Sequence, residues 1–277
     1  MSEKDSIEAS DIPDEGDIPD DFEEAFGMSS SDDEETEPEW ESESDSGEFS
    51  EAISENTKDR LQIGIDGLDE MIRKGVPRES NICVIGGAGT GKTTFGMQFL
   101  AEGLENDEKG VYFSLEQEED DIISTADSKG WNFSEHEAND DLVVVHMDPV
   151  EVATTLRSIR NELPRMISEF GASRVVLDSV TLIEMMFENR ADGRNQIYRF
   201  MRELSNAGAT TLVTSEASED NAYASRYGTI EYLSDAVFVL QYVRTDSASE
   251  TRLALEITKI RDTSHSRQVR PYEHTDD

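Results

Sequence analysis

Eight residues of the chain, GGAGTGKT, run from Gly86 to Thr93 and follow the apolar stretch NICVI. Two glycines separated by four residues and followed by Lys and Thr are typical of a loop that binds phosphate groups. The glycines let backbone N–H groups curve around phosphate oxygens, and the helix that begins next adds positive potential. We therefore expect this loop to bind the phosphates of a nucleotide. The residues expected to contact the nucleotide are Gly86, Gly87, Ala88, Gly89, Thr90, Gly91, Lys92, Thr93 and Thr94.

Three side chains indicate what such a loop would do with a nucleoside triphosphate. Lys92 is placed to reach the β- and γ-phosphates, and the Thr93 hydroxyl is placed to ligate Mg²⁺. Asp178 ends the apolar run RVVLD, where a carboxylate is the usual second anchor of that ion. A strand-end Asp by itself is more often a turn former, and the phosphate loop is what favours the metal role. A nucleoside triphosphate and Mg²⁺ are thus the expected cofactors.

Hydrolysis would also need a group that polarises the attacking water. Glu116 stands at the end of the run YFSLE, after the helix that follows the phosphate loop, and is the candidate general base. Its place at the end of a predicted strand favours this role. The alternative is a surface carboxylate, because Gln117, Glu118 and Glu119 continue the same polar run.

A second candidate site lies near the C-terminus, in the stretch TKIRDTSHSRQVR. The chain has 63 acidic residues against 24 lysines and arginines, so a cluster of cations here indicates a bound anion. The cluster consists of Lys259, Arg261, His265, Arg267 and Arg270. For the last two, pairing with surface carboxylates is the simpler interpretation, and each such pair contributes at most about 1 kcal/mol.

Alternating strands and helices are predicted to hold these residues in place. The expected strands cover residues 81–87, 110–116, 174–180, 209–216, 236–243 and 251–260. The expected helices cover residues 93–104, 148–170 and 194–208. Their alternation predicts an α/β fold with a mainly parallel central sheet flanked by helices.

Composition divides the chain into two parts. Residues 1–58 hold 23 acidic residues and two lysines, and this segment has too little apolar surface to form a core. It is therefore expected to be a disordered acidic tail. Its four aromatic residues could dock on a partner protein, although a merely solvated tail is the simpler interpretation. Residues 59–277 are expected to form the folded domain.

The net charge of −39 is not confined to the tail, because 40 of the 63 acidic residues lie after residue 58. Lysine is also rarer than arginine, 7 against 17. Dense carboxylates with few lysines are typical of a protein from a very salty cytoplasm, where salt screens self-repulsion. The composition therefore predicts salt-dependent folding and an origin in a halophilic archaeon. The alternative is an ordinary acidic protein with an acidic tail.

Several classes of protein are disfavoured. Cys83 is the only cysteine, which excludes an intramolecular disulfide. No apolar run approaches the ~18 residues of a membrane span, and the N-terminal MSEKDSIEAS lacks the regions of a signal peptide. We thus expect a cytoplasmic protein that does not bind membranes. Nucleic acid is not an expected partner either, because the candidate loop at residues 216–228 holds three acidic residues against Arg226 alone.

Several segments, taken in order, resemble the RecA-like ATPases of the KaiC, circadian-clock-type family. They are GIDGLDEMIRKGVPRESNICVIGGAGTGKTTFGMQFL, SLEQEEDDIISTADSKGWNF, VVLDSV, GATTLVTSE, SRYGTIEYLSDAVFVL and LEITKIRDTSH, within residues 60–270. The resemblance implies a RecA-like P-loop NTPase core that assembles into a homo-oligomeric ring, expected as a hexamer, with ATP between subunits. It also implies that Lys259 and Arg261, at the family's K-x-R positions, contact the γ-phosphate in the neighbouring subunit, with His265 nearby.

Three features depart from the family pattern. Gln117 stands where the family often has a second glutamate, which would slow turnover. Clock proteins of the family join two RecA-like halves, whereas this chain has one, and Glu231 and Tyr232 replace the adjacent Ser-Thr phosphoacceptors. Autokinase activity is therefore not expected. The sequence ends at RPYEHTDD, where relatives continue into a final strand, which indicates a shortened C-terminus.

The expected function is ATP binding and hydrolysis by a ring protein that acts in regulation or signal transduction. The alternative is a scaffold that binds ATP to assemble but hardly hydrolyses it, as archaellum-motor relatives are thought to do. The set of Glu116, Lys259 and Arg261 favours hydrolysis, because a pure scaffold would not need it. A DNA recombination or repair protein of the RecA/RadA type is disfavoured by the acidic loop at residues 216–228.

Overall fold

The computed structural model describes residues 59–72, 75–244 and 251–273. The predicted acidic tail, residues 1–58, lies outside the described residues. Within the described part of the chain, no helix is both long enough and apolar enough to cross a membrane.

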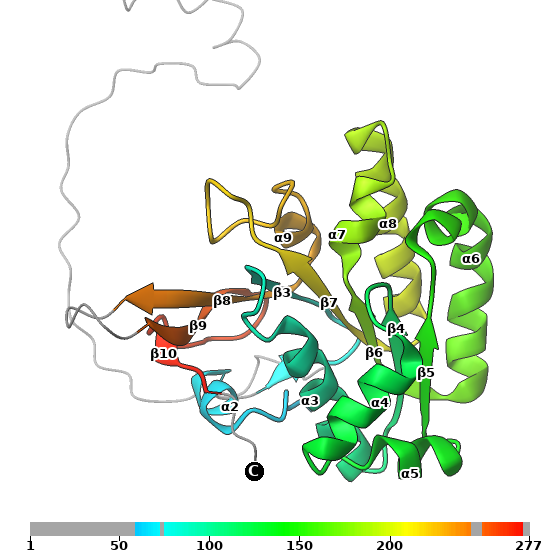
Figure 1. Ribbon diagram of the computed structural model, residues 1–277, viewed down its shortest axis with the longest axis horizontal. Coiled ribbons are helices and arrows are strands. Elements are labelled where there is room, and N and C mark those ends of the chain that lie inside the picture. The colour runs from blue at the N-terminus through cyan, green and yellow to red at the C-terminus, as the bar shows by residue number, and fades with distance from the viewer. Residues whose placement is uncertain (1–58, 73–74, 245–250, 274–277) are drawn as a thin grey trace, which may run out of the picture. The chain divides into compact units, whose positions relative to one another are not determined.

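The centre of the structure is an eight-stranded sheet with the strand order β10-β9-β8-β3-β7-β6-β4-β5. Its strands are β3 (Asn81–Gly86), β4 (Lys109–Ser114), β5 (Leu142–His146), β6 (Ala172–Asp178), β7 (Thr210–Glu216), β8 (Ala236–Arg244), β9 (Thr251–Ile260) and β10 (Arg270–Pro271). Strands β3 to β8 are mutually parallel, and β9 and β10 extend the sheet in antiparallel fashion. A short antiparallel pair, β1 (Arg60–Leu61) and β2 (Val76–Pro77), lies outside this sheet. The predicted mainly parallel sheet is therefore confirmed (Figure 1).

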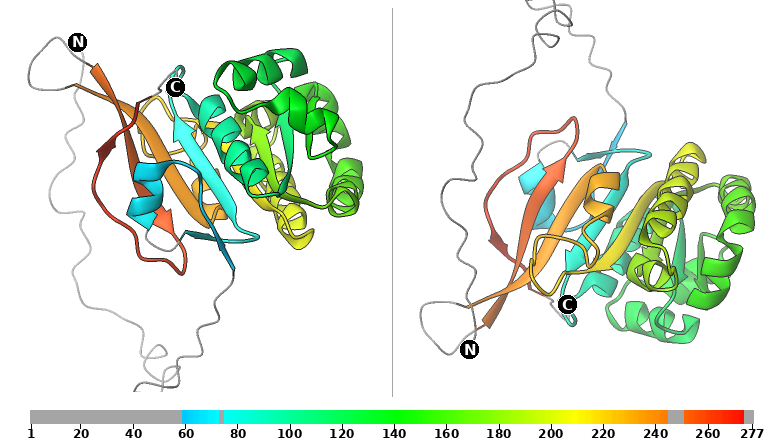
Figure 2. Two further views of the ribbon diagram at one scale, coloured as in Figure 1. Left: turned by 90° about the horizontal axis from the view of Figure 1, so that it is seen from below. Right: turned by 90° about the horizontal axis from the view of Figure 1, so that it is seen from above.

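Helices cover both faces of the sheet, as parallel strands require. They are α2 (Asp66–Ile72), α3 (Lys92–Glu105), α4 (Glu119–Ser128), α5 (Phe133–Ala138), α6 (Pro149–Phe170), α7 (Val180–Met185), α8 (Arg190–Asn206) and α9 (Ile230–Leu233). Apolar side chains of α2 to α5 form one core with the sheet, and those of α6 to α9 form a second core. Figure 2 shows the helices on the two faces and the strands β8 to β10 at one edge.

Capping residues in the sequence set both ends of the long helix α6. The Asp148 carboxylate accepts hydrogen bonds from the N–H groups of Val150 and Glu151, at 2.8 and 3.1 Å, and Pro149 occupies the first turn. These are the features of a helix N-terminus. Gly171 then adopts a φ of 82°, a left-handed conformation that ends the helix. The prediction of a helix over residues 148–170 is confirmed.

Strand β4 ends two residues earlier than its apolar pattern predicted. The Ser114 hydroxyl donates to the Gln117 carbonyl at 2.5 Å and accepts from the Gln117 N–H at 3.0 Å, which closes a turn. The N–H of Leu115 still bonds the Asp178 carbonyl at 2.7 Å. Residue 116 therefore lies within a tight turn instead of ending a strand, and it lies beside the end of β6.

The parallel strands bring several polar residues to one edge of the sheet. Gly86 at the end of β3 is paired with Glu216 of β7, and Ser114 at the end of β4 is paired with Asp178 of β6. Because the carboxyl ends of parallel strands share an edge, the loops that follow them lie together. We call this the carboxyl edge of the sheet.

Candidate active site

The GGAGTGKT loop connects β3 to α3 at the carboxyl edge. Gly89 and Gly91 have φ values of 77° and 85°, which glycine adopts without strain. At Gly86 the space is too small for a side chain, since an added Cβ would lie 2.3 Å from Thr90 Oγ1. The Thr90 hydroxyl in turn donates to the Gly87 carbonyl at 2.9 Å. The glycines therefore serve the loop's conformation, as the sequence predicted.

Lys92, the first residue of α3, folds back over the loop. Its ammonium group donates to the carbonyls of Gly86 and Gly87, both at 3.0 Å. This holds a positive charge against the loop at the N-terminus of a 14-residue helix. Charge, helix dipole and free N–H groups at one point favour an anion there.

Asp178 and Thr93, the two residues expected to bind Mg²⁺, are in direct contact. The Thr93 hydroxyl donates to Asp178 Oδ2 at 2.7 Å, although the two residues are 85 positions apart. Asp178 is 3% exposed and also accepts from the hydroxyls of Tyr112, at 2.8 Å to Oδ2, and of Thr214, to Oδ1. Burial, followed by the Asp178 charge, raises the pKa of Tyr112 well above its usual value, so its hydroxyl remains a donor. The carboxylate is thus oriented from α3, β4 and β7.

Glu116 lies next to this carboxylate. Its Oε1 accepts a hydrogen bond of 2.8 Å from the hydroxyl of Ser179, the residue that follows Asp178. The turn that carries Glu116 is fixed by Ser114 and by His146 of β5, whose Nδ1 lies 2.9 Å from the Gln117 carbonyl. The structure therefore brings the predicted general base to the same edge as the P-loop.

The predicted cations Lys259 and Arg261 lie elsewhere. Ile260 is paired with Ala236 of β8, and Ala236 is paired with Ile82 near the beginning of β3. The P-loop follows the other end of β3. At about 3.3 Å per residue, the two levels are separated by roughly 13 Å along the sheet. Within one subunit these cations are therefore not part of the P-loop site.

Each of the two cations is held by its own subunit. The Lys259 ammonium donates to the carbonyls of Glu231 and Ser234, at 3.1 and 2.6 Å. Burial lowers the pKa of Lys259, and the charge of Arg261 adds to this effect. Arg261 is paired with the Asp235 carboxylate at 2.9 Å and is half exposed.

The rest of the cation cluster is spread out. His265 is partly buried, and the next residue, Ser266, donates its N–H to the Met71 carbonyl at the end of α2 at 2.9 Å. Arg267 and Arg270 are exposed. Tertiary structure therefore divides a sequence cluster that looked like one site.

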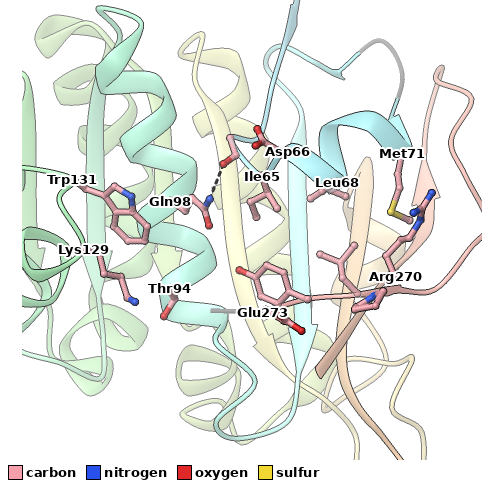
Figure 3. A pocket seen from close by; sticks show the side chains of 15 residues that line it. Ile65, Asp66, Leu68, Met71, Thr94, Gln98, Lys129, Trp131, Arg270 and Glu273 are labelled. Atoms are coloured by element: carbon pink, nitrogen blue, oxygen red, sulfur yellow. Dashed lines mark hydrogen bonds between the residues drawn. The ribbon is translucent and has the colours of Figure 1, made fainter. Parts of the chain in front are cut away.

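A pocket of about 520 Å³ opens beside the P-loop helix (Figure 3). Thr94 and Gln98 of α3 form one wall, and the Gln98 amide donates to the Gly64 carbonyl at 2.7 Å. Trp131 and Lys129 line the pocket after α4, and Arg270 lines it from β10. Thr94, the residue after Thr93, is where this pocket comes nearest in sequence to the phosphate loop.

Sequence patterns missed several residues of the site. Tyr112, Thr214 and Ser179 all bond its carboxylates, and the Tyr242 hydroxyl donates to the carbonyl of Gly89 at 2.7 Å. The available signal was a hydroxyl within an otherwise apolar strand, as in GVYFS and TTLVTS. This signal does not indicate which strands are neighbours in the sheet, so it could not predict which carboxylate each hydroxyl would bond.

Comparison with known proteins shows which family the chain resembles. The family model of the KaiC ATPases matches residues 61–277. The chain belongs to the KaiC family of ATPases. A KaiC-like protein, PH0186 from the hyperthermophilic archaeon Pyrococcus horikoshii OT3, has a similar structure, with a TM-score of 0.69 and 31% sequence identity. The similarity covers 78% of this chain and 95% of that one. The RecA-like P-loop fold expected from the sequence is thereby confirmed.

Curated KaiC proteins are similar over most of this chain. The circadian clock oscillator protein KaiC of Prochlorococcus marinus subsp. pastoris is 32% identical over 235 residues, which cover 81% of this chain and 46% of that protein. KaiC of Synechococcus elongatus is 33% identical over 224 residues, covering 78% and 43%. The chain therefore spans less than half the length of these relatives. Family membership assigns it a nucleotide-binding ATPase domain.

Proposed function

We propose that the protein hydrolyses ATP in a homo-oligomeric ring, a hexamer, and that this activity serves regulation or signal transduction. The observation that carries the proposal is the meeting of the P-loop, Asp178 and Glu116 at one edge of the sheet. These residues come from β3, β6 and the turn after β4. A phosphate cradle, a carboxylate beside a hydroxyl and a second carboxylate are the groups that phosphoryl transfer to water requires.

The roles of the side chains follow from their positions. Glu116 takes a proton from a water molecule whose oxygen attacks the γ-phosphorus, and the bond from that phosphorus to the bridging oxygen of ADP breaks. Lys92 and the N–H groups of the P-loop stabilise the charge that develops on the phosphate oxygens. The Ser179 hydroxyl, bonded to Glu116 at 2.8 Å, orients the base.

Magnesium is the proposed metal cofactor. The hydroxyl of Thr93 and the carboxylate of Asp178 are hard oxygen donors 2.7 Å apart, and Mg²⁺ prefers such ligands together with substrate phosphates. When bound, Mg²⁺ supplies positive charge that neutralises the phosphate oxygens. The pocket of about 520 Å³ beside Thr94 would accept the base and ribose of the same nucleotide.

Lys259 and Arg261 would complete the site of the neighbouring subunit. They lie near the opposite edge of the sheet from the P-loop of their own chain, which supports an action in trans. In the proposed ring, the edge that carries Lys259 and Arg261 in one subunit faces the carboxyl edge of the next subunit. Hydrolysis then depends on assembly, because each site needs cations from its neighbour. Glu231 and Tyr232 occupy the place where autokinase relatives carry phosphoacceptors, so we propose hydrolysis without autophosphorylation.

A nucleic-acid partner is not part of the proposal. Arg226, the one cation of the loop at residues 216–228, pairs with the Glu216 carboxylate at 2.9 Å. The same loop exposes Glu219 and Asp220. A surface of this kind repels phosphate backbones.

Substitution of Glu116 tests the proposal. We expect Glu116→Gln to lower phosphate release by about 100-fold, because a positioned general base contributes at least that factor. Nucleotide binding should persist, since the P-loop is untouched. The measurement is phosphate release at high salt together with equilibrium binding of a fluorescent ATP analogue.

Glu119→Gln is the matched control, because Glu119 is exposed and lies three residues further along the same acidic run. It should release phosphate at the wild-type rate. Equal rates for wild type and Glu116→Gln would exclude the proposed mechanism and favour the assembly scaffold.

A further inference from the structure

The short helix α9 connects Lys259 to the interior of the molecule. The two carbonyls that hold the Lys259 ammonium belong to Glu231, within α9, and to Ser234, directly after it. The C-terminal end of a helix carries partial negative charge, which suits an ammonium group. The position of this cation therefore depends on the position of α9.

The N-terminal end of α9 is anchored to Glu184 of α7. The hydroxyl of Thr229, which precedes the helix, donates to Glu184 Oε1 at 3.0 Å. The Thr229 N–H also donates to the Ser225 hydroxyl at 3.1 Å, and that hydroxyl donates to the Glu231 carboxylate. Both ends of α9 are thus held by polar contacts, one end by Glu184 and the other by Lys259.

Glu184 is an unusual residue for the interior of a domain. It is 9% exposed, and its second oxygen, Oε2, has no hydrogen-bond partner among the described residues. It borders a pocket of about 310 Å³ between α7, the start of α8 and the segment before α9. Burying a carboxylate with one hydrogen bond, and with no cation bonded to it among the residues that the structure describes, costs free energy.

The surroundings of Glu184 place its titration near neutrality. Burial raises its pKa to about 7, and the charge of Glu231 on α9 contributes to the rise. The Thr229 hydrogen bond opposes it. The other titratable or charged groups that face this region are Cys83 of β3, Arg190 and Arg194 of α8, and Tyr227 before α9.

We propose that Glu184 is a positioning residue for hydrolysis, and that it acts through Thr229 and α9 to hold Lys259 in place for the neighbouring subunit. The inference rests on the proposed function, because it requires Lys259 to act in trans. Helix α7 begins at Val180, two residues after Asp178, so one short helix links a subunit's own nucleotide site to the cation that it offers to the next.

The ionisation of Glu184 should govern this positioning. A carboxylate accepts a stronger hydrogen bond from Thr229 than a protonated carboxyl group does, because ionised acceptors strengthen the bond. The raised pKa means that the carboxylate is present above neutrality and is lost as the pH falls through about 7. Lys259 would then be held less firmly, and turnover would fall in the same interval.

The first test is the pH profile of Glu184→Gln. The amide keeps an acceptor for Thr229 but cannot ionise, so we expect kcat to be about fivefold lower at pH 8, as for the loss of about 1 kcal/mol. The inflection of the wild-type profile near neutrality should disappear, with KM for ATP unchanged. Glu188→Gln, at an exposed glutamate after α7, should keep the wild-type profile. An inflection that persists in Glu184→Gln would overturn the proposal.

The second test measures coupling between Thr229 and Lys259. Thr229→Val replaces the hydroxyl by a methyl group and should lower kcat by about fivefold. Thr229→Ser keeps the hydroxyl and should keep the wild-type kcat. In a Lys259→Met background, Thr229→Val should have no further effect on kcat. An equal loss in both backgrounds would mean that Thr229 does not act through Lys259, and thermal unfolding of each variant would separate misfolding from this result.

The two proposals fail differently. If Lys259→Met hydrolyses ATP at the wild-type rate, then the action of Lys259 in trans is wrong and the inference falls with it. If Lys259→Met is impaired but its effect is independent of Thr229, then only the role of Glu184 and α9 is wrong.

Discussion

At the scale of single residues, Arg174 shows how the core accommodates a charge. It is 2% exposed and pairs with the Glu108 carboxylate at 2.5 Å. Its guanidinium also donates to the carbonyls of Gln62 and Phe99, at 3.0 and 2.8 Å, and lies over the Phe99 ring at 4.8 Å from the centroid. One side chain thereby ties β6 to α3 and to the segment before α2.

Replacing Arg174 by Met should destabilise the protein by about 3–5 kcal/mol, because the substitution leaves two carbonyls without their donor and leaves the partly buried Glu108 with Arg78 as its remaining cation. Urea unfolding at fixed salt measures the change. Arg165→Met is the matched control, since Arg165 lies in an exposed i,i+4 ion pair with Glu169 at 3.6 Å. This substitution should lower the free energy of unfolding by about 0.5 kcal/mol or less. A similar loss in both variants would contradict this account.

The ion pair between Arg174 and Glu108 also predicts that stability depends on pH. Burial by itself would raise the pKa of Glu108, but hydrogen bonds from Arg174 and Arg78 outweigh it and lower the pKa. A lowered pKa contributes stability above the unfolded value, and this stability is lost as the pH falls through the folded one. The stability difference between wild type and Arg174→Met should therefore shrink in acid.

At the scale of elements, strand β3 and its neighbours determine which groups can act together. Residues after the carboxyl ends of β3, β4 and β6 share one edge, whereas the antiparallel β9 returns Ile260 to the level of Ile82. A strand is too rigid to bring its two ends together. The direction of β9 therefore places Lys259 and Arg261 away from the P-loop of their own chain.

Assembly should accordingly depend on the nucleotide and on Arg261. We expect sedimentation to show a ring when ATP and Mg²⁺ are present, and Arg261→Ala to weaken this dependence because the γ-phosphate loses its partner across the interface. Arg267→Ala is a suitable control, because Arg267 is exposed and has no proposed role at the site. A wild-type protein that stays monomeric under all conditions would remove the basis for action in trans.

At the scale of the whole molecule, charge is the dominant feature. The chain carries a net charge of −39, with 63 acidic residues among 277. Such a charge favours expansion in dilute buffer, because the carboxylates repel one another over about 10 Å at 0.1 M ionic strength and over about 3 Å at 1 M. We propose that the protein is adapted to high salt.

This adaptation predicts that the urea midpoint of unfolding rises as KCl increases from about 0.1 M to about 1 M. Screening of repulsion in the compact state is the physical reason. A parallel titration with an uncharged osmolyte separates screening from general exclusion of solutes from the surface. A midpoint that does not change with KCl would favour the alternative of an ordinary acidic protein.

The sequence by itself determined the features that depend on neighbours along the chain. The P-loop is a contiguous pattern, and the caps of α6 are local. All six predicted strands are present, and the apolar runs of β3, β4, β6 and β7 are almost entirely buried. The short elements β5 and α5 were missed, since a run of five or six residues leaves little periodicity to detect. The 10-residue helix α4 was missed as well.

Only the tertiary structure decided which distant residues meet. The contacts of Asp178 with Thr93, Tyr112 and Thr214 span 36 to 85 positions, and strand order, not local pattern, creates them. The same holds for the bond from Thr229 to Glu184, which no sequence signal marked. Which strands pair depends on the burial of whole sheet faces formed by segments far apart in the sequence. Residue spacing along the chain therefore cannot specify the pairing.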